Sequence, residues 1–214
     1  MKGICFKEPL FLATIAGKKT QTRRNISIPK GAIGYRTSKN IQGIITEVCA
    51  LDENERPINP RTEQEWVILP KYRAGERIYL KEPYFLCDEV EGLYYNLYKF
   101  NKDELPYTDS KWKNKLFMPE SDARYFIEIT DVRCERLQDI TEEDCIKEGI
   151  IKNEEAKPIG YPFGIKFPFN NGMEKANYST AKEAYAALYD KINGKGTWDS
   201  NPYVWVYDYK LVEQ

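Results

Sequence analysis

The chain has 214 residues, of which 42% are hydrophobic and 30% charged, and its formal net charge at neutral pH is −1. This length suffices for one well-buried core, so we expect a single domain. The near-zero net charge argues against a protein that binds duplex nucleic acid over a broad basic surface. No apolar run approaches the roughly 18 residues of a transmembrane helix. The first six residues lack a signal-peptide core, so a cytoplasmic location with no membrane partner is expected.

The chain contains no histidine. Its absence excludes His-ligated metals and every catalytic unit built on histidine, such as Ser-His-Asp. The cysteines are spread singly along the chain, at Cys5, Cys49, Cys87, Cys134 and Cys145. No pair has the spacing of a zinc knuckle, so we expect small buried hydrophobes and neither a metal nor a cofactor.

The first half of the chain predicts one helix and several strands. Residues 9–16 indicate a short helix, with Pro9 in the first turn and Gly17 as its stop. Apolar alternation bounded by Gly and Pro predicts strands at 18–28, 43–51, 75–82, 93–100 and 124–132.

Two capped helices and a final strand follow. Thr141 begins a capping-box pattern, and Gly149 is the expected stop of that helix. Thr180 and Glu183 predict a second capped helix that runs to Ile192. Residues 158–172 indicate a long loop, and 203–212 alternates as the last strand.

Five or six strands with about three helices, out of strict alternation, indicate an α+β protein. We expect a small mixed or antiparallel β-barrel with the helices at its periphery. No GxGxxG or Walker loop occurs in the chain, which argues against a doubly wound nucleotide-binding fold.

The clearest functional signal is a basic block that spans residues 9–46. It holds seven cations and no acid, with the densest part in Gly17-Lys18-Lys19-Thr20-Gln21-Thr22-Arg23-Arg24. Such a block predicts an electropositive site for phosphate or carboxylate groups. A lysine crowded by other cations can lose its proton and act as a base, with a nearby threonine as nucleophile. The alternative is a solvated, purely structural charged face.

Glu148 is a second candidate, because it falls in the last turn of its predicted helix. A carboxylate there meets the negative end of the helix dipole, which costs up to about 1 kcal/mol and favours protonation. That property suits an acid–base group. The alternative is an exposed helix-end glutamate.

The tryptophans are candidates for stacking on a nucleobase. Trp112 and Trp198 fall in irregular segments, where stacking or rim positions are both open. Trp205 lies on an alternating strand, where a core position is expected instead.

The stretch from Gly17 to Arg24 resembles the GxKxxExR signature of the ASCH domains, which are PUA-like β-barrels proposed to bind RNA or nucleosides. Thr22 replaces the signature's Glu. The stretch is similar to the GxKTxTxR form of small bacterial amidohydrolases that remove the acetyl group from N4-acetylcytidine, and Glu148 matches the functional Glu of that branch in spacing. Nearly the whole chain resembles uncharacterised ASCH-like proteins of bacteria and phages, with extra length at 52–74, 83–122 and 150–180.

The resemblance implies a metal-independent amidohydrolase acting on an N4-acylated cytosine nucleoside. It implies Lys19 as base, Thr22 as nucleophile and Glu148 as proton shuttle. Candidate substrate-binding residues are Arg24, Thr20, Arg23, Glu82, Trp112, Arg124 and Trp198. On a straight strand Lys19 and Thr22 would point to opposite faces, so one shared pocket requires the chain to turn between them.

Two other functions are compatible with the sequence. One is a non-catalytic module that binds a nucleotide or single-stranded RNA along the basic block. The other is a phage or mobile-element accessory protein that docks on another protein through an exposed apolar patch away from the cations.

Overall fold

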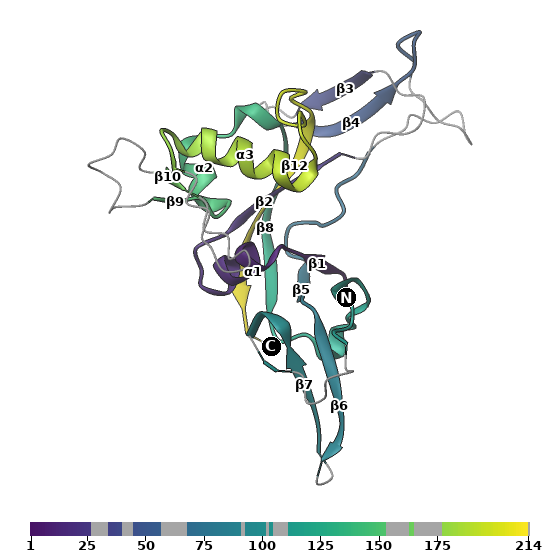
Figure 1. Ribbon diagram of the computed structural model, residues 1–214. Helices are drawn as coiled ribbons and strands as arrows, with labels where there is room; N and C mark the ends of the chain where they lie inside the picture. The colour runs from purple at the N-terminus through teal and green to yellow at the C-terminus, as the bar shows by residue number, and fades with distance from the viewer. Residues whose placement is uncertain are drawn as a thin grey trace.

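The computed structural model of the chain is a mixed α+β protein (Figure 1). It describes residues 1–26, 34–39, 45–56, 68–90, 93–101, 103–104, 111–152, 163–164 and 177–213.

A seven-stranded sheet forms the body of the protein. Its main path runs through β1 (Gly3–Cys5), β5 (Arg77–Lys81), β8 (Phe126–Arg136), β12 (Tyr203–Val212) and β2 (Gln21–Asn25). The β1–β5 pair is parallel and the other pairs on this path are antiparallel. Two further strands, β3 (Gly34–Lys39) and β4 (Ile45–Leu51), join this sheet where β4 pairs with β8.

The strand pairing of the described residues leaves β1 and β2 as the two ends of the path. A side chain joins these ends: the Arg24 guanidinium donates a hydrogen bond of 2.9 Å to the Cys5 carbonyl. The sheet therefore curls far enough to bring its first and last strands within the reach of one arginine. Ladder bonds between β1 and β2, which would close a barrel, are not part of the described pairing.

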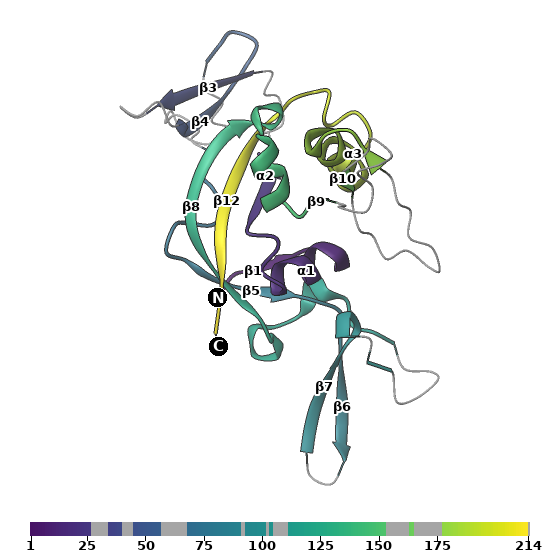
Figure 2. The same cartoon turned by 90° about the vertical axis from the view of Figure 1, so that its left-hand side faces the viewer.

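Three helices lie on one side of the long β8–β12 pair (Figure 2). They are α1 (Glu8–Ile15), α2 (Glu142–Lys147) and α3 (Ala181–Asn193). The predicted caps are confirmed, since the Thr141 hydroxyl accepts the Asp144 N–H and Thr180 forms a full capping box with Glu183.

Smaller elements surround this body. The hairpin of β6 (Tyr84–Val90) and β7 (Leu93–Tyr98) projects away from it (Figure 1). A three-stranded sheet contains β9 (Ile151–Lys152), β10 (Phe163–Gly164) and β11 (Asn177–Tyr178). Single 3₁₀ turns occur at Lys99–Asn101, Lys115–Phe117, Glu120–Asp122 and Leu137–Asp139.

The predicted helices and strands have counterparts in the same order and differ at some ends, but the strands β1, β3 and β6 were not predicted. In the strand expected at 18–28, only Gln21–Asn25 is extended as β2, and 27–28 lie outside the described residues. The last strand has the expected bounds. Of the loop expected at 158–172, only 163–164 is described, and it belongs to β10. Much of the predicted insertion at 52–74, from 57 to 67, also lies outside the described residues.

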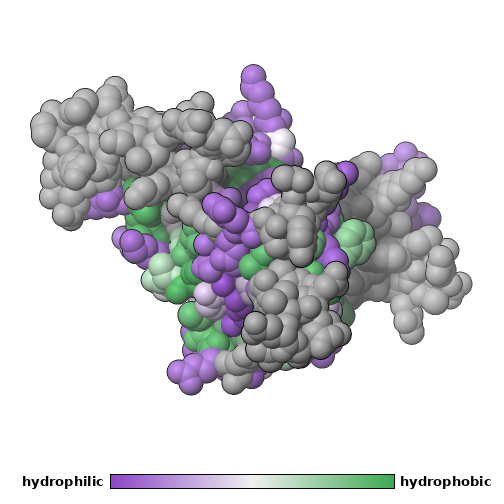
Figure 3. Space-filling view, turned by 60° about the horizontal axis from the view of Figure 1, so that its bottom comes forward, coloured by the Kyte–Doolittle hydropathy of each residue, from purple (hydrophilic) through white to green (hydrophobic). Residues whose placement is uncertain are grey.

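The main core lies between the sheet and the helices and includes Phe11, Leu80, Ile127, Leu188 and Tyr207. Trp205 belongs to it, as its strand alternation predicts. One face of the molecule carries hydrophilic and hydrophobic side chains close together in its described part (Figure 3). Within the described residues, no helix combines the length and apolar character needed to cross a membrane.

Candidate functional site

Lys19 lies in the connection between α1 and β2. The α1 helix ends at Ile15, and Gly17, just after the C-cap residue Ala16, has a left-handed φ of 68°. The Lys19 N–H still donates to the Ala13 carbonyl at 3.0 Å, and the strand begins only at Gln21. Because Lys19 precedes the strand, the alternation of faces does not separate it from Thr22. The turn required for a shared pocket is therefore present.

The Lys19 ammonium is almost fully buried, with 1% of the residue exposed. It donates to the Gln21 carbonyl at 2.6 Å, to the Glu148 carbonyl at 2.8 Å and to the Glu148 carboxylate at 2.7 Å. Burial lowers the pKa of Lys19, the bond to Glu148 opposes this effect, and the charges of Arg24 and Arg23 add to it. The sequence correctly indicated a depressed lysine pKa but assigned it to crowding by cations, whereas burial is the larger cause.

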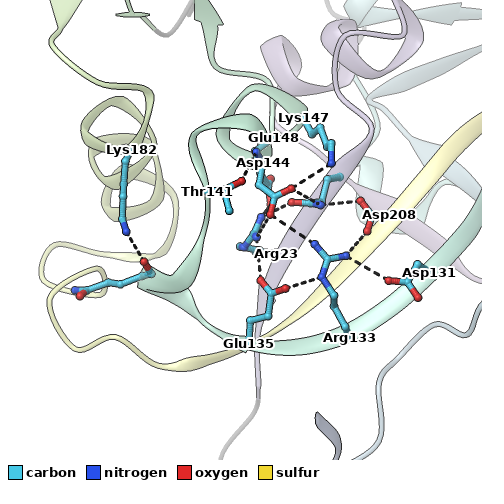
Figure 4. Close-up of polar contacts among 12 residues, drawn as sticks. Arg23, Asp131, Arg133, Glu135, Thr141, Asp144, Lys147, Glu148, Lys182 and Asp208 are labelled. Carbon is cyan, nitrogen blue, oxygen red and sulfur yellow. Dashed lines mark hydrogen bonds and ion pairs between the residues drawn. The ribbon is translucent and has the colours of Figure 1, made fainter. Parts of the chain in front are cut away.

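Arg23 is buried in a cluster of carboxylates (Figure 4). Its guanidinium contacts Glu135 and Asp144 at 3.1 Å each, and Glu148 at 3.3 Å. Burial opposes ionisation of Asp144, but the neighbouring Arg23 lowers the pKa of this carboxyl below its usual value. Acids from β8 and α2 therefore neutralise part of the basic block, which the local count of charges did not reveal.

A second arginine extends this cluster across the sheet. Arg133 contacts Glu135 at 2.5 Å and Asp131 at 3.3 Å, and it also pairs with Asp208 (Figure 4). The Gln21 amide donates to Asp208 at 2.7 Å and to Asp144 at 3.3 Å. The face of β2 that carries Gln21 is thereby fixed to α2 through a continuous polar network.

A cavity of about 240 Å³ opens beside β2, and we call it the Lys19 cavity. Lys19, Thr22, Arg24 and Glu148 all line it. The cavity lies at the end of the sheet, so residues from both faces of β2 reach it, including Arg23. The remaining walls come from the β1–α1 connection, from α3 and from the turn at Lys115.

Phe6 forms part of this wall between the two cations. Its ring centroid lies 5.5 Å from the Lys19 ammonium and 5.4 Å from the Arg24 guanidinium carbon. These are cation–π distances, and a ring in this position excludes water from both charges. The bond from Arg24 to the Cys5 carbonyl then fixes the arginine at the cavity's edge.

Five other candidate residues lie outside the lining of the Lys19 cavity: Thr20, Glu82, Trp112, Arg124 and Trp198. Glu82 is fully buried and accepts two bonds from Arg124, at 3.0 and 2.8 Å. Trp198 packs edge-on against Tyr185, with ring centroids 6.2 Å apart. These contacts are of the kind that stabilise a fold.

Several residues of the cavity were missed by sequence reasoning. Phe6 follows the first strand without any motif, and Tyr185 and Tyr189 fall within the capped helix predicted after Thr180, where no motif marks them as site residues. The Tyr189 hydroxyl donates to the Asn25 side chain at 2.6 Å, which joins α3 to β2. The only signal available was the polar tip that each tyrosine carries on an otherwise apolar helix face.

Glu148 caps the C-terminal end of α2, as its predicted position requires, but it is not exposed. The alternative of a solvated helix-end glutamate is wrong, because only 4% of the residue is exposed and its two carboxylate oxygens contact Lys19 and Arg23. These cations replace the water that such a carboxylate would otherwise need.

No protein-family model, no curated protein and no solved structure matches the chain. The residues of the Lys19 cavity and their chemistry are therefore the basis for inferring a function.

Proposed function

We propose that this protein is an amidohydrolase of the ASCH-like, PUA-like barrel class that removes an acyl group from the N4 amine of a cytosine nucleoside. The observation that carries this proposal is the convergence of Lys19, Thr22, Arg24 and Glu148 on one cavity. The curled sheet, with Arg24 joining its two ends, is compatible with a barrel of that class.

The Lys19–Glu148 pair supplies the proton chemistry. The two groups are 2.7 Å apart, so the ammonium can pass a proton to the carboxylate and become a neutral amine. Burial favours this state, since it removes both charges from a poorly solvated site. The proton that moves between the Lys19 amine and the Glu148 carboxylate stays within the pair.

In the first half of the reaction, Thr22 Oγ attacks the acyl carbonyl carbon while its proton moves to the Lys19 amine. The carbonyl electrons move to the oxygen, and the Arg24 guanidinium stabilises this oxyanion. The C–N bond then breaks, and the departing N4 amine takes the proton from Glu148. The products are the free cytosine nucleoside and an acyl ester on Thr22.

In the second half, water attacks the ester and gives a proton to the Glu148 carboxylate. The Thr22 oxygen leaves with that proton, and the carboxylic acid is released. Lys19 and Glu148 end in their starting protonation states, so the sum of the steps is hydrolysis of one amide bond by one water.

A non-catalytic nucleoside-binding module is the second candidate, and one observation favours it. The Lys19 ammonium has three protons and three acceptors, so its bonds are complete without a substrate. Such saturation is the pattern of a structural buried ion pair.

Hydrolysis of N4-acetylcytidine, followed by chromatography, distinguishes the two candidates. We expect Lys19→Met, Thr22→Val and Glu148→Gln each to lose about 10²- to 10⁴-fold in kcat/KM. Lys18→Met is the matched control, because Lys18 is exposed and adjacent, and it should keep full activity. Mass spectrometry of a rapidly quenched reaction should show an acetyl group on Thr22. Cytidine binding without any turnover would favour the binding module.

A further inference from the structure

A second cavity adjoins the Lys19 cavity, and we call it the Lys71 cavity. Its volume is about 440 Å³, and Cys5 and Arg24 line both cavities. The main chain of Cys5 and the Arg24 guanidinium bonded to it therefore form the wall between them. The Lys19 cavity, at about 240 Å³, is below the range of roughly 300–1,000 Å³ that drug-sized ligands occupy. It suits an acylated base better than a whole nucleotide.

The charges that line the Lys71 cavity all have one sign within the described part of the chain. Arg24, Lys71 and Lys81 contribute cations, and no described Asp or Glu lines it. None of these three side chains forms a salt bridge with a described carboxylate. Lys81 donates to the Leu116 carbonyl at 2.9 Å, and the Lys71 ammonium lies 5.2 Å from the Tyr72 ring centroid. These neutral contacts leave the positive charge uncompensated by any described carboxylate, in contrast to Lys19 and Arg23.

Apart from Asn25, the other side chains that line the Lys71 cavity are mostly apolar or aromatic. Buried rings of Tyr72 and Tyr207 form part of it, 5.3 Å apart and edge to face. Leu69 and Leu116 also line the cavity, although 63% and 60% of these residues are exposed. Uncompensated cations beside exposed apolar side chains suit an anion attached to a partly apolar group, such as the phosphate and sugar of a nucleotide.

We propose that the Lys71 cavity binds the phosphate of a nucleotide whose acylated cytosine occupies the Lys19 cavity. The substrate is then a phosphorylated or phosphodiester-linked nucleoside rather than a free one. This inference rests on the proposed function for the identity of the base. Arg24 contacts both cavities, so it can bind the phosphate on one side and face the acyl group on the other.

The test is equilibrium binding measured by calorimetry, with cytidine, cytidine 5′-monophosphate, cytidine 3′-monophosphate and the dinucleotide CpC as probes. One phosphate with charge-assisted bonds should tighten binding about ten- to a hundredfold relative to cytidine. Lys71→Gln and Lys81→Gln should remove most of this advantage and leave cytidine binding unchanged. Lys195→Gln, an exposed lysine that lines neither cavity, is the matched control and should keep the full advantage.

The outcomes separate the two proposals, because binding does not require turnover. Equal affinity for cytidine and its monophosphates, or an advantage that survives both substitutions, overturns the phosphate site even if N4-acetylcytidine is hydrolysed. A phosphate advantage that is lost in both variants supports it even if no amide is cleaved. Tighter binding of CpC than of either monophosphate identifies a strand as the source of the phosphate, and equal binding identifies a mononucleotide.

Discussion

Replacing Glu148 with Gln tests whether the Lys19–Glu148 pair is the electrostatic centre of the site. The substitution keeps the shape of the side chain and an acceptor oxygen for Lys19, but it removes the negative charge. Arg23 retains Asp144 and Glu135 at 3.1 Å, whereas Lys19 has Glu148 as its only carboxylate partner among the described residues. The variant therefore leaves one buried ammonium without a counter-charge.

Breaking a buried pair from one side costs about 3–5 kcal/mol, and the retained acceptor places this variant near the lower figure. The cost depends on pH. Burial already lowers the pKa of Lys19, and loss of the opposing Glu148 lowers it further. A lysine with a lowered folded-state pKa gains folding stability as pH rises from that pKa toward the unfolded value near 10.5. This gain is larger in Glu148→Gln than in the parent, so the difference between them should shrink as pH rises.

Urea unfolding of both proteins at pH 7 and at pH 9.5 measures this difference. The double variant Lys19→Met, Glu148→Gln should be more stable at pH 7 than Glu148→Gln alone, because it removes the unpaired charge as well. A cost below about 1 kcal/mol, the usual size for an exposed pair, would refute the reasoning. A cost that is equal at both pH values would also refute it.

Three further measurements test the Lys19–Glu148 pair and its neighbours Asp144 and Gly149. If the Lys19–Glu148 pair must hold one proton, kcat/KM for N4-acetylcytidine should fall as pH rises, with a midpoint below pH 10.5. A kcat/KM that increases up to pH 10.5 would contradict the shared-proton step. Asp144→Asn should lower the free energy of unfolding in urea by about 3 kcal/mol at pH 7 and by much less near pH 2. Arg23 lowers the pKa of Asp144 in the folded state, so this ion pair stabilises the fold above the unfolded-state pKa of 3.8, and the stabilisation is lost as pH falls through the folded-state pKa. Gly149→Ala should lower stability more than Gly17→Ala, for which we expect a cost of about 1–2 kcal/mol, and thermal unfolding compares the two variants. A Cβ at Gly149 would lie 3.3 Å from a leucine side chain and 3.5 Å from the aliphatic part of Lys19, whereas a Cβ at Gly17 would have nothing within 4 Å.

Local sequence patterns predicted the helix caps and the last strand correctly. The caps at Thr141 and Thr180 and the strand 203–212 depend on residues close together in the chain, so alternation and capping rules predict them. The strand expected to begin at residue 18 begins later, because the Thr20 backbone divides its hydrogen bonds between two elements. The Thr20 N–H donates to the Lys147 carbonyl, and the Thr20 carbonyl accepts from the Tyr209 N–H. Those partners are remote in sequence, and no local rule identifies them.

The sequence pointed to some of the residues that line the Lys19 cavity, but not to its aromatic walls or its electrostatics. Lys19 and Glu148 were selected, the first from a basic block and the second from an unfavourable helix position. A count of nearby charges suggested an open electropositive patch. The structure instead buries Lys19 and Arg23 against carboxylates from β8 and α2, over sequence distances of more than a hundred residues. Only the fold decides which positive charges have a carboxylate partner. Lys71 and Lys81, which lie outside the basic block, have none among the described residues.

The pairing of β2 with β12 has a consequence for synthesis on the ribosome. In the described sheet β2 pairs only with β12, and Arg24 lies opposite Trp205. The strand β2, which carries Thr22 and Arg24, is synthesised long before its partner strand β12, with most of the described elements between them. A nascent chain therefore cannot assemble the Lys19 cavity until β12 is free to insert between β8 and β2. Such non-local pairing slows folding and leaves unpaired meanwhile the edge of β8 that β12 will occupy, so we expect the early intermediates to depend on chaperones.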